Sequence, residues 1–359
     1  MLRQYMSSIN KRITIKEVAK EAKVSPSTVG RAIGGYGYVS GQTRRKILKT
    51  AKKLNYHPNL LASNFRRQKT HTIGLIIPDI TNPFFTTVAR GVEDQARKKQ
   101  FKVFVCSTDE DPDIEKEYID DLIQRRVEGF VIAPSTGGGK HLFNLQSDKI
   151  KFVVVDREVK NLKADTVHSD NVDGAYRLTN YLIKLGHRRI GIINGAMQTS
   201  VAIQRFTGYK KALLESNVPI VDALVKGNDW RMEGSYKHTM ELLTSKFPPT
   251  AIFAANNILG VGVLRALREM GLKVPTDMSV VCFDDVPVAS LMYPFLTVVA
   301  QSPYTMGKLA AQILLERISG QGPAERQDIV LKPNFIIRES CRPPRNSGEI
   351  HILSGMEDK

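Results

Sequence analysis

Acidic, amide and aromatic side chains stand just past several apolar runs of strand length. Asp156, Asn256 and Asp284 lie at or within two residues of the end of such a run, and Phe84 and Phe85 lie a few residues beyond another. Carboxylates and amides bind hydroxyl groups by hydrogen bonds, and aromatic rings pack on apolar ligand faces. Because parallel sheets bind ligands at the carboxyl ends of their strands, these residues are candidates for a small-molecule site. Each also admits an ordinary role as a cap, a core residue or a link between lobes.

Patterns typical of catalysis are missing from the sequence. The segment PSTGGGKH at 134–141 resembles a phosphate-binding loop, but it lacks the first glycine and has His141 where Ser or Thr is needed. We interpret it as a mobile surface loop. The histidines show no metal-ligand spacing, and no nucleophile elbow occurs. The sequence therefore predicts a protein that is not an enzyme and holds no metal ion or cofactor.

The elements that would position these residues alternate between strand and helix. Apolar runs occur at 73–77, 103–106, 130–133, 152–155, 190–193, 251–254 and 280–283, and helical spacing between them includes 115–126 and 173–185. Continuous apolar strands separated by helices predict parallel sheets that are covered on both faces.

Positive charge is concentrated at the amino terminus. Residues 1–70 contain 16 Lys and Arg against Glu17 and Glu21, whereas the other 289 residues contain 36 basic and 34 acidic residues. A solvated basic face is one interpretation. A nucleic-acid-binding surface is favoured because the segment also has the pattern of a folded domain.

Three short helices are predicted in this basic segment. Thr14 and Glu17 have the spacing of a capping box, and Ser25 followed by Pro26 is typical of a second helix start. A third helix is expected over about 42–54. Its predicted inner face consists of Ile47, Leu48, Ala51 and Leu54. Two short helices around a tight turn, braced by a third, indicate a helix-turn-helix domain.

The chain resembles the lac repressor (LacI/GalR-type) family up to about Pro343. The resemblance is carried by TIKEVAKEAKVSPSTVGRAI, YVSGQTRRKILKTAKKLNYHPN and THTIGLIIPDITNPFF. It implies an all-α helix-turn-helix headpiece and an α/β core of two doubly wound parallel-sheet lobes, like type I periplasmic binding proteins. It also implies a homodimeric regulator, most often a repressor, whose affinity for operator DNA is modulated by a small ligand between the lobes.

Domain boundaries follow from the same resemblance. The expected parts are a headpiece over 12–57, a hinge helix and linker over 58–70, a first lobe of 71–170 with 302–331, a second lobe of 171–301 with 332–345, and a disordered tail over 346–359.

The resemblance assigns DNA contacts by position. Residues at base edges would be Pro26, Ser27 and Arg31, and residues at phosphates would be Thr14, Ser25 and Asn59. Arg31 has two parallel donors that suit a guanine edge, although a phosphate contact is the alternative. The chain departs from the family pattern at Lys23, Gly30 and Gly34–Gly35, where the family usually has Gly, Ser and Asn-Gly. We expect these glycines to make the free headpiece less stable.

The resembled hinge folds on the operator and inserts an apolar side chain between base pairs. Phe65 stands where leucine is usual, with Arg66 beside it as a phosphate ligand. An aromatic wedge would kink the duplex. Packing of Phe65 against the core is the alternative.

In the core, the resemblance adds Arg205 and Trp230, the only tryptophan, to the effector site. The expected set is Phe84, Phe85, Asp156, Arg205, Trp230, Asn256 and Asp284. Aromatic faces with Asp, Asn and Arg suit a sugar, while Arg205 equally suits the carboxylate of a sugar acid or a phosphate. The family commonly has aspartate where Asn257 stands.

Two other function classes stay open from sequence alone: a solute-binding protein without a regulatory role, and a non-specific nucleoid-type DNA binder. No apolar run is long enough to span a bilayer and no secretory signal is recognised, so the protein is expected in the cytoplasm without a membrane partner. Cys106 and Cys282 lie in apolar runs and are expected to be buried and reduced.

Overall fold

The structure is a computed structural model that describes residues 13–34, 36–56, 70–137, 139–285 and 296–345. The chain divides into two compact units, Met1–Thr70 and His71–Lys359. We call the described helical part of the first unit, residues 13–56, the headpiece and the second unit the core, and each is described by itself.

The headpiece contains α2 (Ile15–Ala22), α3 (Pro26–Gly34) and α4 (Gly41–Lys53). A capping box of Thr14 and Glu17 starts α2, and Ser25 Oγ accepts a hydrogen bond from Thr28 N at the start of α3. The hydrophobic interior of the headpiece contains Val18, Ala19, Ala22, Val29, Ala32, Ile47 and Ala51. The predicted helix-turn-helix arrangement is therefore confirmed. The predicted burial of Leu48 is wrong, since 48% of this residue is exposed on α4.

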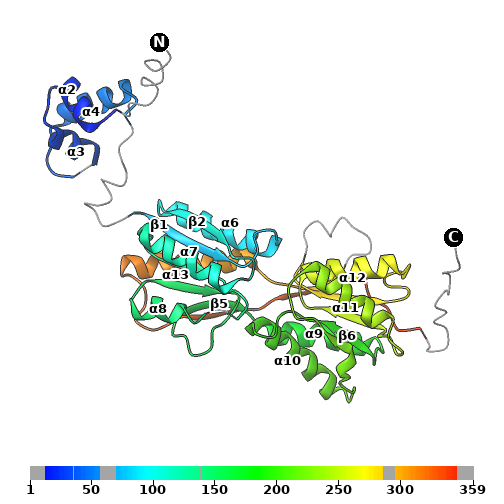
Figure 1. Ribbon diagram of the computed structural model, residues 1–359. Helices are drawn as coiled ribbons and strands as arrows, with labels where there is room; N and C mark the ends of the chain where they lie inside the picture. Colours follow the sequence, from blue (N-terminus) through cyan, green and yellow to red (C-terminus); the bar gives the residue numbers. More distant parts are fainter. Residues whose placement is uncertain (1–12, 35, 57–69, 138, 286–295, 346–359) are drawn as a thin grey trace, which may run out of the picture. The chain divides into compact units, whose positions relative to one another are not determined.

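The core consists of two lobes, each built on a six-stranded sheet (Figure 1). The first lobe contains β1 (Thr72–Ile77), α6 (Pro83–Lys98), β2 (Lys102–Ser107), α7 (Pro112–Gln124), β3 (Phe130–Ile132), α8 (Leu142–Ser147), β4 (Phe152–Val155), β5 (Asp165–Ser169), α13 (Pro303–Ser319) and β11 (Asp328–Leu331). The second contains α9 (Asn171–Lys184), β6 (Ile190–Ile193), α10 (Ser200–Glu215), η1 (Asp222–Leu224), β7 (Val225–Lys226), α11 (Met232–Leu243), β8 (Ala251–Ala254), α12 (Asn257–Glu269), β9 (Ser279–Phe283), β10 (Thr297–Ala300) and β12 (Asn334–Ile336).

The two sheets have equivalent strand orders. Their strand orders are β2-β1-β3-β4-β5-β11 and β7-β6-β8-β9-β10-β12. All pairs are parallel except β10 with β12, which is an antiparallel edge pair. In each sheet the chain reverses its winding direction next to the first strand, at β1/β3 and at β6/β8. Doubly wound sheets bind ligands at this switch point, beyond the carboxyl ends of the strands.

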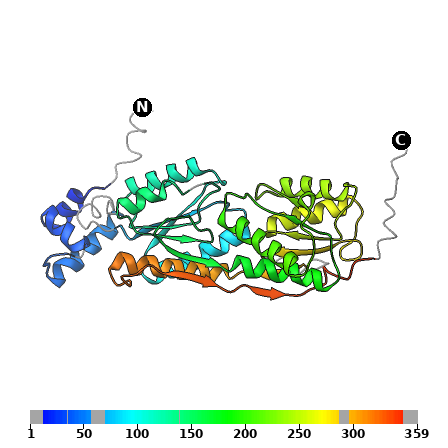
Figure 2. The ribbon, with the colours of Figure 1, turned by 90° about the horizontal axis from the view of Figure 1, so that it is seen from below.

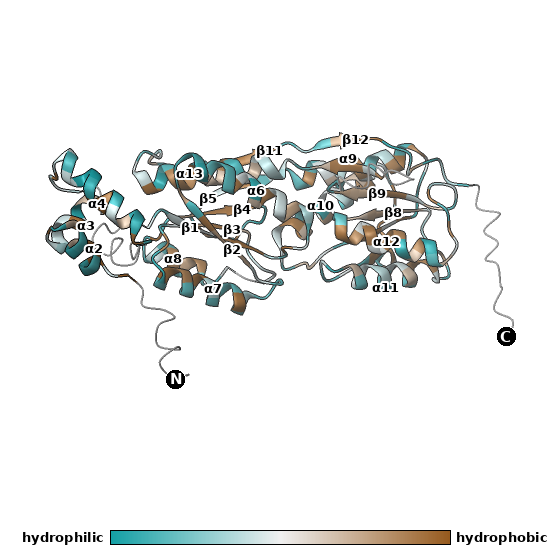
Figure 3. Cartoon of the chain, turned by 90° about the horizontal axis from the view of Figure 1, so that it is seen from above, coloured by the Kyte–Doolittle hydropathy of each residue, from teal (hydrophilic) through white to brown (hydrophobic). Residues whose placement is uncertain are grey.

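Helices cover both faces of each sheet, as the apolar runs predicted. In Figure 3 most of the central strands are brown, whereas the helices around them carry both brown and teal residues. In the first lobe, α6 and α13 pack on one face, and α7 and α8 on the other. In the second lobe, α9 and α10 oppose α11 and α12.

The chain passes between the lobes at three places: after β5, after β10 and after β11 (Figure 2). These crossings put side chains of both lobes on a shared opening. One prediction about the core is wrong: Cys106 is only partly buried, because β2 is an edge strand, whereas Cys282 on β9 is fully buried. Among the described residues, no helix is long and apolar enough to cross a membrane.

Candidate functional site

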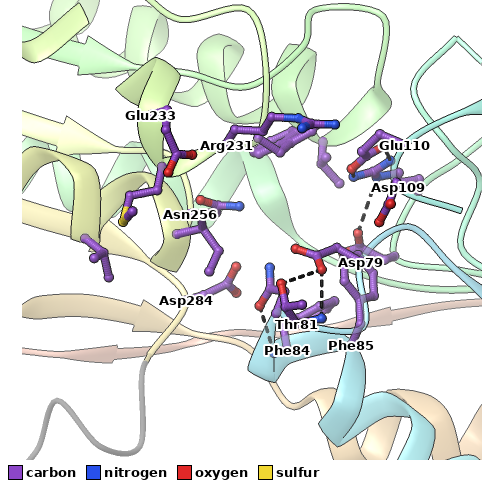
Figure 4. A pocket seen from close by; sticks show the side chains of 18 of the residues that line it. Asp79, Thr81, Phe84, Phe85, Asp109, Glu110, Arg231, Glu233, Asn256 and Asp284 are labelled. Carbon is purple, nitrogen blue, oxygen red and sulfur yellow. Dashed lines mark hydrogen bonds and ion pairs between the residues drawn. The ribbon is translucent and has the colours of Figure 1, made fainter. Parts of the chain in front are cut away.

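A cavity of about 440 Å³ lies between the two lobes of the core. All seven residues predicted for the effector site line it: Phe84, Phe85, Asp156, Arg205, Trp230, Asn256 and Asp284. Asn256 and Asp284 of the second lobe face Phe84 and Phe85 of the first across the opening in Figure 4. The arrangement brings the predicted residues together, while their contact with a ligand stays a prediction.

Asp156 and Asp284 occupy equivalent places in the two lobes. Each follows its fourth strand in the common order, β4 or β9, and each has a positive φ, 63° and 70°. Their backbone amides donate to Val167 O and Val299 O of the next strand, at 3.0 and 2.9 Å. Left-handed backbone is unfavourable for aspartate, and such conformations concentrate at functional sites. The backbone of each lobe thus presents one carboxylate to the cavity.

Three aromatic residues line the cavity: Phe84 and Phe85 from the first lobe, and Trp230 from the second. Phe84 and Phe85 begin α6, pack edge to face with centroids 5.0 Å apart, and also belong to the core of the first lobe. Trp230 lies in the β7–α11 connection, and its ring covers Gly195, where a Cβ atom would come within 2.3 Å of the indole. Glycine at 195 therefore makes room for the indole.

Arg205 is held by the second lobe. Its guanidinium donates to Asn171 Oδ1 at 2.8 Å and to Ala255 O at 2.6 Å, and it lies 3.9 Å from Asp284 Oδ2. Burial raises the pKa of Asp284 to about 6, although Arg205 and a hydrogen bond from Gln301 oppose this shift. Burial likewise raises the pKa of Asp156, against the attraction of Arg157.

Asn256 caps α12, since its side-chain oxygen accepts from Leu259 N at 2.7 Å. Asn256 therefore does act as a helix cap, which was one of the alternatives from sequence. The cap uses only its side-chain oxygen, so the side-chain NH₂ group can still donate a hydrogen bond into the cavity. The neighbouring Asn257 donates to Asn82 Oδ1 of the first lobe at 2.9 Å, which links the two lobes next to the cavity.

Sequence reasoning missed the part played by Arg157 and Glu110. Arg157 donates to both carboxylate oxygens of Glu110, each at 2.6 Å, and to Pro134 O at 2.8 Å. Glu110 also accepts from the backbone and hydroxyl of Thr136. Burial raises the pKa of Glu110, but Arg157 and Thr136 outweigh it and hold this pKa below its ordinary value. The position of Arg157 directly after Asp156 was the available signal.

The burial of Pro134 and Ser135 corrects the interpretation of this part of 134–141 as a mobile surface loop. Ser135 is buried, and its amide donates to the buried carboxylate of Glu115 at 2.5 Å. His141 Nε2 lies 2.7 Å from the other oxygen of Glu115. The carboxylates of Glu115 and Glu110 therefore accept hydrogen bonds from the consecutive amides of Ser135 and Thr136. The carbonyl oxygen of Pro134, in the same segment, accepts a hydrogen bond from Arg157.

Several buried polar atoms around the cavity have no hydrogen-bond partner within the described part of the chain. They include Asp156 Oδ1, Arg157 Nε and Trp230 Nε1. Buried polar groups are normally paired, so these atoms are candidates for hydrogen bonds to a bound ligand. The described residues contain no group of three His, Cys, Asp or Glu side chains that could hold a metal ion.

In the headpiece, the predicted DNA-contacting residues lie around the start of α3. Ser25, Pro26 and Ser27 are exposed, Arg31 is partly exposed, and Thr14 is exposed at the start of α2. Ser25 Oγ and Ser27 Oγ are 2.8 Å apart. Asn59, Phe65 and Arg66 lie outside the described residues. The start of a second helix in this arrangement is the part that enters a major groove.

The glycines of α3 have a structural explanation. A Cβ atom on Gly34 would lie 2.4 Å from the ring of Tyr36, and one on Gly30 would lie 3.2 Å from its hydroxyl oxygen. Tyr36 therefore packs where side chains at these two positions would extend. Lys23, at the turn where the family usually has glycine, adopts φ 53°.

Comparison with known proteins agrees with this architecture. Residues 14–59 match the family of bacterial regulatory proteins, lacI family, and residues 179–341 match a periplasmic binding protein-like domain. The ribose operon repressor of Haemophilus influenzae is 33% identical over 91% of this chain and 98% of its own length. A LacI-family regulator from Enterococcus faecium, solved with bound ribose, is 33% identical with a TM-score of 0.69, covering 76% of this chain and 99% of that one.

The lac repressor dimer bound to operator and the anti-inducer ONPF has a TM-score of 0.81 at 25% identity, over 92% of this chain and 100% of that one. The likeness thus extends over headpiece and core together and includes relatives above 30% identity. The chain therefore belongs to the lacI family of bacterial transcriptional regulators.

Proposed function

We propose that this ligand-modulated transcriptional repressor binds operator DNA as a homodimer and that its effector is a neutral monosaccharide held between the lobes. The observation that supports the proposal is the composition of the cavity. Two strand-end carboxylates, two guanidinium groups and an indole carry unpaired or partly paired polar atoms next to aromatic surface. Sugars present this same combination of vicinal hydroxyls and apolar C–H faces.

The charge of the cavity favours a neutral ligand over a sugar acid or sugar phosphate. Six carboxyl side chains line it against three arginines: Asp79, Asp109, Glu110, Asp156, Glu233 and Asp284 face Arg157, Arg205 and Arg231. An anion would meet a net negative lining, whereas hydroxyl groups donate to carboxylates without that repulsion.

The relatives favour an aldopentose as the first ligand to test. One relative is named a ribose operon repressor, and a similar structure contains ribose. A cavity of about 440 Å³ is within the usual range for small-molecule sites. We expect the charged groups to bind the ligand and not to catalyse its conversion, and we expect the protein to act on cytoplasmic DNA.

Thermal unfolding of the full chain with a panel of ligands tests the effector. The panel contains ribose, other aldopentoses, a hexose, a sugar acid and a sugar phosphate. We expect a neutral sugar to raise the Tm, and Asp156→Asn and Asp284→Asn to reduce the shift while the protein stays folded. A panel in which only the anionic compounds raise the Tm would contradict the neutral-sugar assignment.

Binding to DNA is tested separately. The full chain should select a preferred sequence from a randomised duplex pool, and the active ligand should change its affinity for that sequence. Specific readers discriminate their sites from other DNA by 10³-fold or more, so equal affinity for all duplexes would overturn the regulatory function.

A further inference from the structure

The strands of the first lobe begin at an edge that we call the basic edge. We define it by the three turns that lead from α6, α7 and α8 into β2, β3 and β4: residues 97–102, 123–130 and 146–152. Backbone hydrogen bonds join these turns to each other and to the start of β1. Lys102 N donates to His71 O, Glu128 N to Thr72 O, and Phe130 N to Lys151 O. Adjacent strands are about 4.8 Å apart, so the edge extends roughly 15 Å across four strand starts.

The charge of this edge differs from that of the rest of the core. Its basic residues are Arg97, Lys98, Lys99, Lys102, Arg125, Arg126, Lys149 and Lys151, and its acidic residues are Glu128 and Asp148. The remaining positions of 71–359 contain 28 basic and 32 acidic residues. All of the excess positive charge of the core is therefore located on these three turns.

The second lobe provides an internal comparison because the first five strands of its sheet have the same order and the same parallel pairing. The same rule, from the last two residues of a helix to the first of the strand, selects residues 214–225, 242–251 and 268–279. These turns contain three basic and four acidic residues. The fold itself thus does not require cations where its strands begin.

Most of the cations on the basic edge are available to a partner. Lys98, Lys99, Lys102, Arg125, Lys149 and Lys151 are exposed, and none of these six forms a salt bridge with another residue in the described ranges. Arg97 differs, since it is paired with Asp94 at 2.5 Å. Like charges in one place repel each other, and a polyanion relieves that repulsion.

The position of the edge in the chain indicates which polyanion. β1 begins at Thr72, beside Lys102, and the linker from the headpiece enters the core at this point. The thirteen residues 57–69 span at most about 45 Å when fully extended. This tether sets an upper limit on how far from the strand starts a duplex held by the headpiece can lie.

We propose that the basic edge binds the phosphate backbone of the duplex that flanks the sequence read by the headpiece. This inference rests on the proposed function, because it needs a headpiece that holds DNA. Phosphate contacts of this kind add affinity and salt dependence and carry no sequence information.

Two duplexes test the proposal. Both are centred on the sequence that the full chain selects from a randomised pool, one of about 20 base pairs and one extended with constant flanks. The slope of log affinity against log salt is measured on each for the wild type, for K98Q/K99Q/K102Q and for R125Q/K149Q/K151Q. The matched control on the second lobe is K246Q/R268Q/K273Q.

We expect a steeper slope for the wild type on the long duplex, by roughly 0.9 for each added phosphate contact. Each basic-edge variant should lose part of this difference and bind the long duplex several-fold more weakly at low salt. Both should bind the short duplex like the wild type, and the control variant should behave as wild type on both.

Equal slopes for the wild type on the two duplexes would overturn the proposal. It would also fail if both basic-edge variants retained the full difference, or if they lost affinity equally on the short and the long duplex. Failure to select any sequence from the pool would count against the proposed function instead, so the two failures are distinguishable.

Discussion

At the scale of single residues, the cavity contains a buried carboxyl group, that of Asp284, whose raised pKa should make ligand binding sensitive to pH. Asp284 is buried beside Arg205, and its pKa is raised to about 6. Hydroxyl groups that donate to the carboxylate stabilise the ionised form. Binding of a neutral sugar should therefore weaken as the pH falls below 6, by up to tenfold per pH unit, because the carboxyl must first lose its proton. Titration calorimetry at pH 5, 6 and 7.5 measures this dependence.

The same group has the opposite effect on the stability of the ligand-free protein. Its raised pKa means that the folded state binds a proton more tightly than the unfolded state between about pH 4 and 6. The contribution of Asp284 to stability thus falls as the pH rises through that window. Asp284→Asn should flatten both curves, and an unchanged pH profile of ligand binding in this variant would exclude Asp284 as the titrating group.

A second prediction at this scale concerns Glu110, which holds Arg157 with both carboxylate oxygens. Glu110→Gln keeps the shape of the side chain but leaves a buried guanidinium without its main counter-charge. We expect a loss of roughly 3 kcal/mol in the free energy of unfolding and weaker sugar binding. Urea denaturation of the full chain measures the first effect. The matched control is Glu93→Gln, whose partner Arg90 is exposed, and it should cost under about 1 kcal/mol.

At the scale of elements, the apolar runs predict β2 and most of the strands inside the two sheets, whereas β5, β7, β10, β11 and β12 have no matching run. The runs at 152–155, 190–193 and 251–254 coincide with β4, β6 and β8, because strands buried on both faces read as continuous apolar sequence. β11 alternates between exposed and partly buried residues over four positions, and β12 has one exposed and two partly buried residues, so both are too short for a period to be recognised. The predicted burial of Leu48 rests on helical spacing and that of Cys106 on an apolar run, and neither pattern shows which positions another element covers.

The site shows the same limit. Residues at strand ends could be placed because the topology fixes where strand ends meet. The contacts of Arg157 with Glu110, and of Asn257 with Asn82, join segments 47 and 175 residues apart. Such pairs depend on the packing of the turns and leave no local pattern in the sequence.

The glycines of α3 give a prediction about this element. Gly30→Ala should stabilise the headpiece by up to about 1 kcal/mol, since alanine favours the helix and its Cβ would lie 3.2 Å from the far end of the flexible Tyr36 side chain and in ordinary contact, at 3.7 Å, with Ile15 Cδ1. Gly34→Ala should destabilise it, because its Cβ would overlap the Tyr36 ring. Hydrogen exchange of amides in residues 14–54 of the full chain measures both effects. In a Tyr36→Ala background, Gly30→Ala and Gly34→Ala should change the stability of the headpiece similarly. If Gly34→Ala still destabilised the headpiece there, the cause would be the backbone conformation at residue 34 and not the Tyr36 ring.

At the scale of the whole molecule, two kinds of connection join the lobes of the core: the three crossing segments of the chain, and a side-chain hydrogen bond between Asn257 and Asn82. The crossings fix the lobes as neighbours, and the Asn257–Asn82 hydrogen bond joins the lobes next to the cavity that Asn82 lines. Asn82 Oδ1 also accepts from Phe84 N at 2.9 Å, so this oxygen is committed to the start of α6. The amide of Asn82 therefore has no freedom to turn round without losing the cap.

Asn257→Asp, which restores the residue common in the family, consequently places a carboxylate against the Asn82 oxygen. We expect this repulsion to favour separated lobes and to weaken sugar binding about tenfold. Ligand and DNA affinities are reciprocally linked, so the factor by which the sugar changes operator affinity must equal the factor by which operator changes sugar affinity. Fluorescence anisotropy with and without sugar, and calorimetry with and without operator, measure the two factors independently. In Asn257→Asp both factors should change together, whereas weaker sugar binding with an unaltered linkage factor would show that this contact shapes the cavity and does not couple it to DNA.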